Sequence, residues 1–441
     1  MIRMLKTENF SDRELTVFLL LTALVLRVIY AIVYFCTTPS PVTNAYYEIA
    51  VQILDQGRIL YDTDSPYYES VGPLLPWINA FTMLVTGRNY LGLYIVTALI
   101  SSLVTVYTYK LARLFTDKKV ALFIGIWSAF YLFYFYFTPT PGKDIWMSFF
   151  LIFLIYNLIV LFRFGSFSWT RFLTFTFLFV LSFHLDERFI VFTPFIFLYI
   201  LYYEISSSGK FRVGEALIFA ILVIVLMIPW TIRNYNKHNK IVLLSTRTES
   251  FTDKILGYEP GEHIIDRYTD IHGVYYLHDY QIDSVINGLK TTTDEGVKIT
   301  PGMIKALIKG KRPAPLTGMK AAGSRLVTMF EPFQIRGRFE RTGYFYYKKS
   351  FRHNIATFLF YGILFIFSFP GFYFLYKRDR HTATLFISVI IIYALIHALA
   401  IPYTNWRYRL PLDSLFIIAG CSGMAQIWSI IRNRNLNADK E

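Results

Sequence analysis

The sequence predicts an all-α membrane protein that crosses the bilayer about ten times. Of its 441 residues, 54% are hydrophobic and 19% aromatic, whereas only 17% are charged. The apolar residues come in runs of about 20, the length that a helix needs to cross the hydrocarbon core. Basic residues gather in the short segments between alternate runs, as the positive-inside rule requires. A soluble chain has too little interior to hide this many large apolar side chains.

Ten apolar segments are long enough to cross. The first shows no small-residue cleavage site after it, so we expect a retained span and not a removed signal peptide. The segments are 15–36, 90–112, 120–138, 145–163, 170–184, 188–203, 214–231, 355–376, 382–401 and 411–430.

The segment Gly72–Gly87 is an eleventh candidate, but it is short and contains Pro73 and Pro76. If it crossed, the basic loop 110–119 would face outward. If it lies in the interface, every short basic loop and both termini face the cytoplasm. We therefore predict ten spans with Gly72–Gly87 as an interfacial helix on the outer face.

This topology predicts three parts. Residues 1–232 form a transmembrane catalytic module with the first three outer loops, 233–353 form a large non-cytoplasmic loop between spans seven and eight, and 354–441 form the C-terminal transmembrane helices.

Charge and cysteine content exclude several classes of protein. The net charge of +14 is explained by basic cytoplasmic loops and anionic lipid head groups, and no nucleic-acid motif is present. Cys36 and Cys421 lie at or in membrane segments, so neither a disulfide framework nor a thiolate metal site is expected. The absence of a Rossmann or phosphate-loop motif gives no support to a nucleotide-sugar substrate.

Lys143 and Asp144 stand directly before the apolar run 145–163. A carboxylate at mid-bilayer would cost roughly 2.5–3.5 kcal/mol, but most of this cost disappears at the interface. Asp144 therefore has two interpretations. It either marks the start of a helix, where an acidic residue suits the helix dipole, or is kept for chemistry.

The other predicted outer loops also carry charges. A short amphipathic helix is expected over 44–56, with Glu48 on it, and the third loop contains Asp186, Glu187 and Arg188. Guanidinium groups bind phosphate oxygens bidentately, so arginines at one membrane face match the phosphate of a lipid carrier. A charge pair at about 4 Å contributes on the order of 4 kcal/mol in a partly shielded site. The alternative is that these arginines are ordinary interfacial anchors.

Five segments resemble one family, in order along the chain. They are "NAYYEIAVQIL" with "LYDTDSPYYESVGPLLPW", "YKLARLFTDKKVALFIGIWSAF", "TPTPGKDIWMSFFLIF", "PWTIRNYNKHNKIVLLST" and "RYRLPLDSLFIIAG". The chain resembles the C-superfamily of polytopic glycosyltransferases, in particular the family 39-like branch with protein O-mannosyltransferases and the bacterial aminoarabinose transferase of lipid A.

The resemblance implies transfer of a sugar from a polyprenyl-phosphate carrier to a lipid, glycan or protein acceptor on the non-cytoplasmic face, with inversion. A carboxylate would deprotonate the acceptor while cations stabilise the leaving phosphate. Asp144 matches the second-loop acid. The candidates for the carrier phosphate are Lys143, Arg188, Arg233, Arg407 and Arg409. No residue is assigned as a metal ligand, and the use of a divalent metal ion as a cofactor stays an open alternative.

One position departs from the family. The first-loop acid, the usual candidate base, falls on Asn44, which cannot usefully accept a proton. Four explanations stay open: Glu48 substitutes one helical turn later, Asp144 acts alone, the chemistry has been lost or changed, or the alignment is shifted.

Three further features have simpler explanations. Arg27, in the middle of the first span, either faces an aqueous cavity, snorkels, or is buried against a neighbouring carbonyl. His397 is expected to be a hydrogen-bonded core histidine. Residues 261–279 are rich in His and Asp, but their spacing matches no recurring metal site, so a solvated loop is expected.

Other functions predict other sequence features. A polysaccharide polymerase or ligase would build its site mainly from the large outer loop, and a transporter would show internal repeats, which we do not find. A family member without activity is supported by Asn44. The chain ends without a retention signal, which favours a bacterial plasma membrane over the endoplasmic reticulum.

Overall fold

The structure is a computed structural model. It describes residues 10–38, 45–57, 71–140, 142–164, 167–208, 213–239, 241–244, 323, 326–327, 329–332, 355–400 and 406–438. Within these ranges the chain is helical or connects helices, and no strand occurs, so the all-α prediction is confirmed. The chain divides into two units, which are considered separately. The first unit comprises Met1–Thr248, Ile363–Ile390 and Leu410–Glu441, and the second comprises Glu249–Gly362 and Ile391–Arg409.

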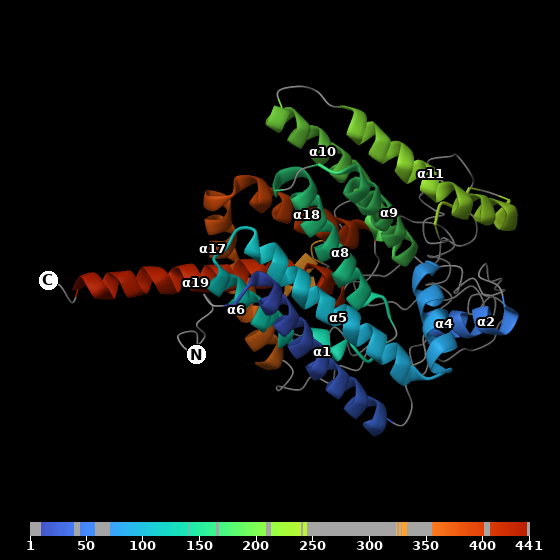
Figure 1. Ribbon diagram of the computed structural model, residues 1–441, viewed down its shortest axis with the longest axis horizontal. Helices are drawn as coiled ribbons and strands as arrows, with labels where there is room; N and C mark the ends of the chain where they lie inside the picture. Colours follow the sequence, from blue (N-terminus) through green and yellow to red (C-terminus); the bar gives the residue numbers. More distant parts are fainter. Residues whose placement is uncertain are drawn as a thin grey trace, which may run out of the picture. The chain divides into compact units, whose positions relative to one another are not determined.

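The N-terminal half of the first unit is a packed group of long helices (Figure 1). Helix α1 packs against α5, and α5 packs against α6 and α8. Helix α1 begins at a capping box, in which the Ser11 side chain accepts from the Glu14 backbone N–H and the Glu14 side chain accepts from the Ser11 backbone N–H. Asn89 caps the start of α5. The bounds are α1 Asp12–Thr37, α5 Tyr90–Arg113, α6 Lys118–Ala129, α7 Leu132–Tyr136 and α8 Asp144–Ile159.

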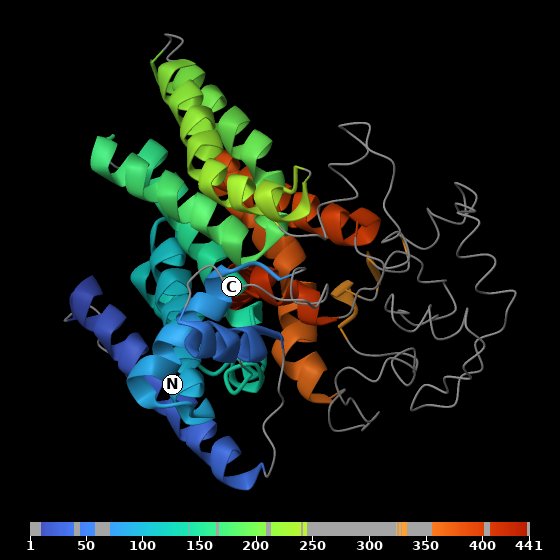
Figure 2. The ribbon, with the colours of Figure 1, turned by 90° about the vertical axis from the view of Figure 1, so that its right-hand side faces the viewer.

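The rest of the first unit adds two groups of helices. Helices α10 and α11 lie side by side, in green to yellow-green in Figure 2, and α11 also packs against α9. Helices α17 and α19 can approach closely because Gly371 and Gly423 have no side chain. A Cβ at either position would collide with a carbonyl oxygen of the other helix. The bounds are α9 Trp169–Leu185, α10 Phe192–Ser208, α11 Val213–His238, α17 Ile363–Arg378, α18 Arg380–Ala400 and α19 Asp413–Ala438. Residues of α18 from Ile391 onward belong to the second unit.

Eight stretches of the described helices are long and apolar enough to cross a membrane. They coincide with eight of the ten expected spans. The other two expected spans, 170–184 and 188–203, correspond to α9 and α10, which have 17 residues each. The chain is thus a multi-pass membrane protein, while the count of ten spans and the large outer loop stay predictions. The boundaries at 232 and 353 also stay predictions, because most of 233–353 lies outside the described residues.

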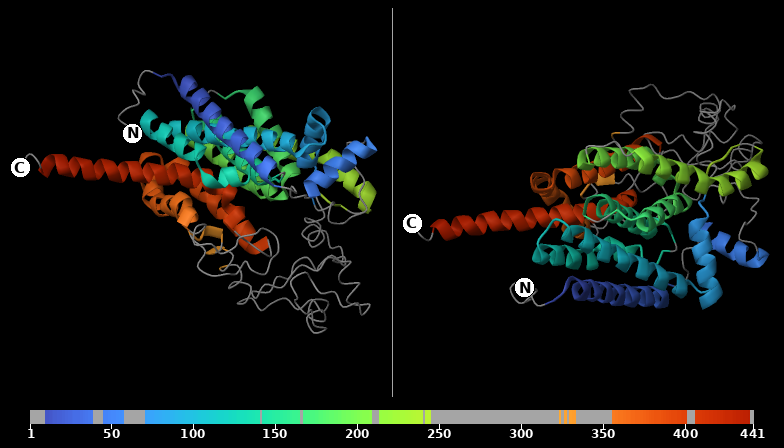
Figure 3. Two further views of the ribbon diagram at one scale, coloured as in Figure 1. Left: turned by 90° about the horizontal axis from the view of Figure 1, so that it is seen from below. Right: turned by 45° about the horizontal axis from the view of Figure 1, so that its top comes forward.

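Two shorter helices pack together at the end of the first unit where α5 begins. They are α2 (Ala45–Gln56) and α4 (Leu74–Thr86), and their shared core includes Ile49, Ala80 and Met83. Helix α2 is amphipathic as expected, with Ala45, Ile49, Ala50 and Ile53 buried and Leu54 half-buried. Helix α4 has 13 residues and runs steeply across the direction of α1 and α5 (Figure 3). This orientation fits an interfacial helix better than a span.

Arg27 is fully buried in the middle of α1. Its Nη2 donates to the Thr105 hydroxyl and to the Ser128 carbonyl, each at 3.1 Å. Because α6 ends at Ala129, the Ser128 carbonyl lies in its last turn, where a nearby cation is favourable. Of the three explanations for Arg27, burial against a carbonyl is the one observed.

Candidate active site

Four charged side chains lie where α8 begins and α9 ends. Lys143 precedes α8, Asp144 is its first residue, and Asp186 follows the last residue of α9. Arg188 lies in η3, a 3₁₀ helix over Glu187–Val191. All four are buried, with Asp186 fully so. We call Lys143, Asp144, Asp186 and Arg188 the charged cluster.

Asp186 is the centre of this cluster. Its carboxylate accepts from the Arg188 backbone N–H at 3.0 Å, from Nε at 2.5 Å and from Nη2 at 2.7 Å. It also forms an ion pair with the ammonium group of Lys143. Burial alone would raise the pKa of Asp186, but the charges and hydrogen bonds of Arg188 and Lys143 outweigh burial and hold this pKa well below its usual range. Asp186 is therefore ionised at neutral pH.

Lys143 is held charged by the same contact. Burial opposes its charge, but the carboxylate of Asp186 outweighs burial, with smaller contributions from Tyr46 and Glu187, and raises the pKa of Lys143. Lys143 thus pairs with Asp186 from another segment, although Asp144 is its neighbour in sequence. Two of the five cations expected to bind the carrier phosphate, Lys143 and Arg188, thus share one carboxylate, that of Asp186.

Asp144 lies on the side of α8 that faces η3. Arg188 donates to the sulfur of Met147 at 3.1 Å, which ties η3 to α8. Met147 follows Asp144 by three residues, so the two share one face of the helix. The Asp144 carbonyl accepts from the Ser148 hydroxyl at 2.9 Å, and the position in the first turn suits a negative charge. Asp144 therefore does mark the start of a helix, as the first of its two interpretations states. This position is compatible with a chemical role.

Helix α2 brings a different side chain to the charged cluster than the one we expected. Tyr46 lies close enough to act on the charge of Lys143, whereas Glu48 acts on Tyr90 at the start of α5. Residues two apart on an α-helix point to opposite sides. This geometry favours Asp144 over Glu48 as the acid beside Lys143. Asn44 lies outside the described residues.

An aromatic group joins α4, α9 and α11 at the same end of the first unit. The rings of Trp77 and Trp230 meet nearly at right angles, 5.7 Å apart, and His184 meets Trp230 at 5.9 Å. His184 precedes Asp186 by two residues. The guanidinium of Arg233 lies 5.0 Å from the Trp230 ring, and its Nη1 donates to Asn234 at 3.0 Å. Arg233 is therefore fixed at this end of α11.

The last two candidates belong to the second unit. Arg409 is buried there, with its guanidinium carbon 3.1 Å from the centre of the Tyr361 ring, and Arg407 is half-buried. His397 of the same unit is a buried histidine whose Nδ1 lies 2.8 Å from the Tyr393 carbonyl, as expected for a core histidine.

Sequence reasoning underrated Asp186. The run "LDERF" marks an acidic residue that ends one helix and caps the next, and the Asp186 side chain does accept from the Arg188 backbone. Its link to Lys143 depends on how α8 packs against α9. Among the described residues, no group of three or more His, Cys, Asp or Glu is placed to hold a metal ion, and 261–279 lie outside them.

Comparison with known proteins places the charged cluster in a family context. Residues 70–232 match the model of the dolichyl-phosphate-mannose-protein mannosyltransferase family. This stretch contains all four residues of the cluster. No curated protein matches the chain at a significant level.

Solved structures of an archaeal oligosaccharyltransferase from Archaeoglobus fulgidus share the fold. The complex with an inhibitory peptide and a dolichol-phosphate has a TM-score of 0.51 at 14% identity over 96% of this chain. The apo form has a TM-score of 0.54 at 12% identity, also over 96% of this chain. The chain spans about half the length of these proteins, since it covers 52% of each.

The resemblance to the C-superfamily of polytopic membrane glycosyltransferases is confirmed over residues 70–232 by the family model, and the solved structures share the fold over nearly the whole chain. Within that class, the matching model is that of the dolichyl-phosphate-mannose-protein mannosyltransferases.

Proposed function

We propose that the protein transfers a sugar from a polyprenyl-phosphate carrier to an acceptor at the outer face of a membrane. The observation that carries this proposal is the charged cluster, a buried carboxylate beside two buried cations within the stretch that matches the family model. The Archaeoglobus structure with a bound dolichol-phosphate supports a lipid-linked donor. The acceptor is a lipid, a glycan or a protein, and the membrane is a bacterial plasma membrane.

The reaction we propose is a single displacement. An acceptor hydroxyl oxygen attacks the anomeric carbon, and the bond from this carbon to the phosphate oxygen breaks as the new bond forms. The leaving phosphate takes the bonding electron pair, and the hydroxyl proton passes to a carboxylate. Because attack and departure occur on opposite sides of the anomeric carbon, its configuration inverts.

Asp144 is the carboxylate that we assign to proton transfer. It is a buried member of the cluster, and the resemblance matches it to the second-loop acid of the family. Lys143 and Arg188 supply positive charge where the phosphate oxygens develop negative charge. Asp186 holds these two cations in place while no donor is bound, because their attraction to its carboxylate offsets the free-energy cost of burying them. Arg233, Arg407 and Arg409 are further candidates for the phosphate. Glu48 is the alternative acid, because it could substitute for Asn44, which stands at the family's first-loop acid position.

The stereochemistry of the product tests this mechanism. The full chain in lipid vesicles would receive a polyprenyl-phosphate sugar of known anomeric configuration, and the product would be examined by NMR. We expect an inverted anomeric centre together with release of one polyprenyl phosphate per transfer. A retained configuration would rule out single displacement, and release of a polyprenyl diphosphate would rule out the assigned donor.

A further inference from the structure

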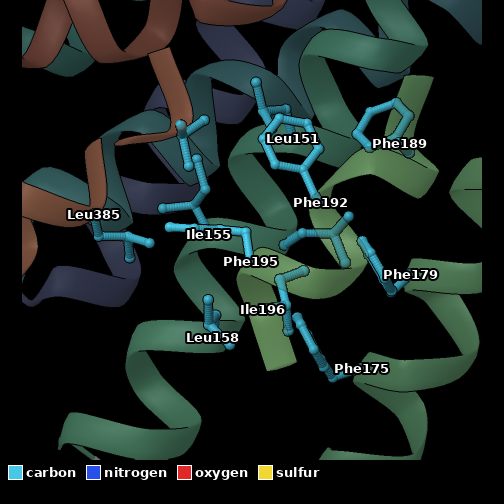
Figure 4. A pocket seen from close by; sticks show the side chains of 12 residues that line it. Leu151, Ile155, Leu158, Phe175, Phe179, Phe189, Phe192, Phe195, Ile196 and Leu385 are labelled. Carbon is cyan, nitrogen blue, oxygen red and sulfur yellow. The ribbon is translucent and has the colours of Figure 1, made fainter. Parts of the chain in front are cut away.

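The apolar pocket between α8, α9, η3, α10 and α18 is too small to be a ligand site (Figure 4). Its cavity volume is about 30 Å³, and its lining side chains are all hydrocarbon. A water molecule would find room but no polar partner there, and a larger guest would find no room. A better-defined polar arrangement lies at the end of α11.

The chain reverses its direction where α11 ends. Asn239 has a φ of 52°, a left-handed conformation that asparagine adopts more readily than most residues, and its backbone N–H donates to the Tyr235 carbonyl at 2.9 Å. Residues 241–244 follow, and we call them the returning segment. Val242 and Leu244 in this segment are buried. Side chains from the last turns of α11 bind its carbonyl groups, so the segment runs back along the helix.

Asn234 is buried and binds the returning segment and Arg233 at the same time. Its Nδ2 donates to the Val242 carbonyl at 3.0 Å and to the Leu244 carbonyl at 3.2 Å. An asparagine amide has two N–H donors, so these bonds use both of them. They also fix which way the amide faces, because a reversed amide would place its oxygen against two carbonyl oxygens. The Oδ1 atom therefore faces Arg233 and accepts from its Nη1 at 3.0 Å.

Arg233 is held on a second side by Trp230. The Arg233 guanidinium lies 5.0 Å from the Trp230 ring, and the indole N–H of Trp230 donates to the Leu244 carbonyl at 2.7 Å. The same ring contacts His184, two residues before Asp186 of the charged cluster. A guanidinium is planar and its donors point in fixed directions, so holding one Nη sets the directions of the others. Arg233 is therefore oriented before any ligand binds.

We propose that Asn234 is a positioning residue for the transfer reaction, and that it orients Arg233 to bind the phosphate of the carrier lipid. The inference rests on the proposed function, because Asn234 acts through one of the candidate phosphate ligands. An oriented guanidinium loses less conformational freedom on binding than a mobile one, so orientation increases its affinity for phosphate. Asn234 should then matter for phosphate binding only while Arg233 is present.

A double-mutant cycle tests this dependence, with Arg233→Ala, Asn234→Ala and the double variant. Asn234→Asp is a second test of the same position, since it keeps the shape of the side chain but gives Arg233 a carboxylate that competes with phosphate. The control is Asn236→Ala, which removes an exposed asparagine of the same helix. Binding of farnesyl phosphate, a short isoprenyl phosphate, to the detergent-solubilised full chain would be measured by a thermal-shift titration. The melting temperature without ligand reports folding.

We expect Arg233→Ala to weaken farnesyl phosphate binding by about tenfold or more and Asn234→Ala or Asn234→Asp by about fivefold or more, with Asn236→Ala within about twofold of wild type. In the Arg233→Ala background, Asn234→Ala should add less than about twofold, because no guanidinium is left to orient. A merely structural role of Asn234 would instead weaken binding equally in both backgrounds.

Three results would overturn the proposal and leave the proposed function standing. The effects of Arg233→Ala and Asn234→Ala could multiply in full, a folded Asn234→Ala or Asn234→Asp could bind farnesyl phosphate as wild type does, or a folded Arg233→Ala could do so. If the wild type does not bind farnesyl phosphate, the proposed function itself fails.

Discussion

Asp186, which follows α9, and Lys143, which precedes α8, form a buried ion pair. The two residues are far apart in sequence, so their contact fixes how the beginning of one helix meets the end of another. Arg188 binds the same carboxylate through Nε and Nη2. A donor phosphate that reaches this place therefore meets cations that are already oriented and charged.

Removing the charge of Asp186 should destabilise the protein. Asp186→Asn leaves Lys143 and Arg188 buried without their shared carboxylate, which typically costs about 3–5 kcal/mol. Denaturation of the detergent-solubilised protein would measure the loss. The control is Asp55→Asn, which breaks the exposed pair of Asp55 with Arg88 and should cost about 1 kcal/mol or less. Equal effects of the two substitutions would show that the buried contact adds nothing.

The pH dependence of this difference has a defined sign. The folded pKa of Asp186 is depressed, so its stabilisation is fully present above the unfolded pKa, about 3.9, and is lost as pH falls toward the folded value. The folded pKa of Lys143 is raised, so its contribution is present below the unfolded pKa, about 10.4, and is lost as pH rises through the folded value. In the wild type these two contributions should stay constant from about pH 5 to 9. In Asp186→Asn no carboxylate opposes the burial of Lys143, which lowers its pKa, so the stability gap between wild type and variant should narrow as pH rises through this range. A gap that widens with rising pH would contradict the assigned charges.

The topology can be tested with single cysteines in a background where Cys36 and Cys421 are replaced. If α4 lies in the interface, Asn89 labels from outside and Thr116 from the cytoplasm, because α5 separates them. A membrane-impermeant maleimide applied to intact cells would distinguish the two faces. Labelling of Asn89 from the cytoplasm alone would make α4 a span and put Asp144 on the wrong side.

The arginines of the second unit give a separate prediction. Arg407→Ala or Arg409→Ala should raise the KM for the lipid-linked donor more than Arg380→Ala, because Arg380 is predicted to face the cytoplasm. Arg409 packs on Tyr361, so Arg409→Ala also needs a check of folding. If the double substitution Arg407→Ala and Arg409→Ala leaves the KM unchanged in a folded protein, these arginines are interfacial anchors.

The fold was largely predictable because long apolar runs can be satisfied in a bilayer only as helices. The start of α8 at Asp144 and the short helix α2 also follow from local sequence. The break between α6 and α7 did not, since 126–136 contains neither Gly nor Pro. At this break Arg27 of α1 donates to the Ser128 carbonyl, a contact that depends on packing between helices. The role of Asp186 and the opposite directions of Tyr46 and Glu48 likewise depend on packing between helices.

The measurement that tests the account most directly compares turnover in three variants. Asp144→Asn keeps the shape of the side chain but removes its charge, Glu48→Gln does the same on α2, and Asp379→Asn is a control in which another buried carboxylate loses its ion pair with Arg163. Release of polyprenyl phosphate by the full chain in vesicles is the readout, with the folded fraction measured in parallel.

If Asp144 accepts the proton, Asp144→Asn should lower turnover by about 100-fold or more, the usual range for a general base. Glu48→Gln and Asp379→Asn should retain turnover within about tenfold of wild type, because neither removes the group that takes the proton. If Glu48→Gln is the inactivating change and Asp144→Asn is nearly silent, the base lies on α2 and the assignment of Asp144 is wrong. If both are silent in an active preparation, Asp144 serves only to begin α8.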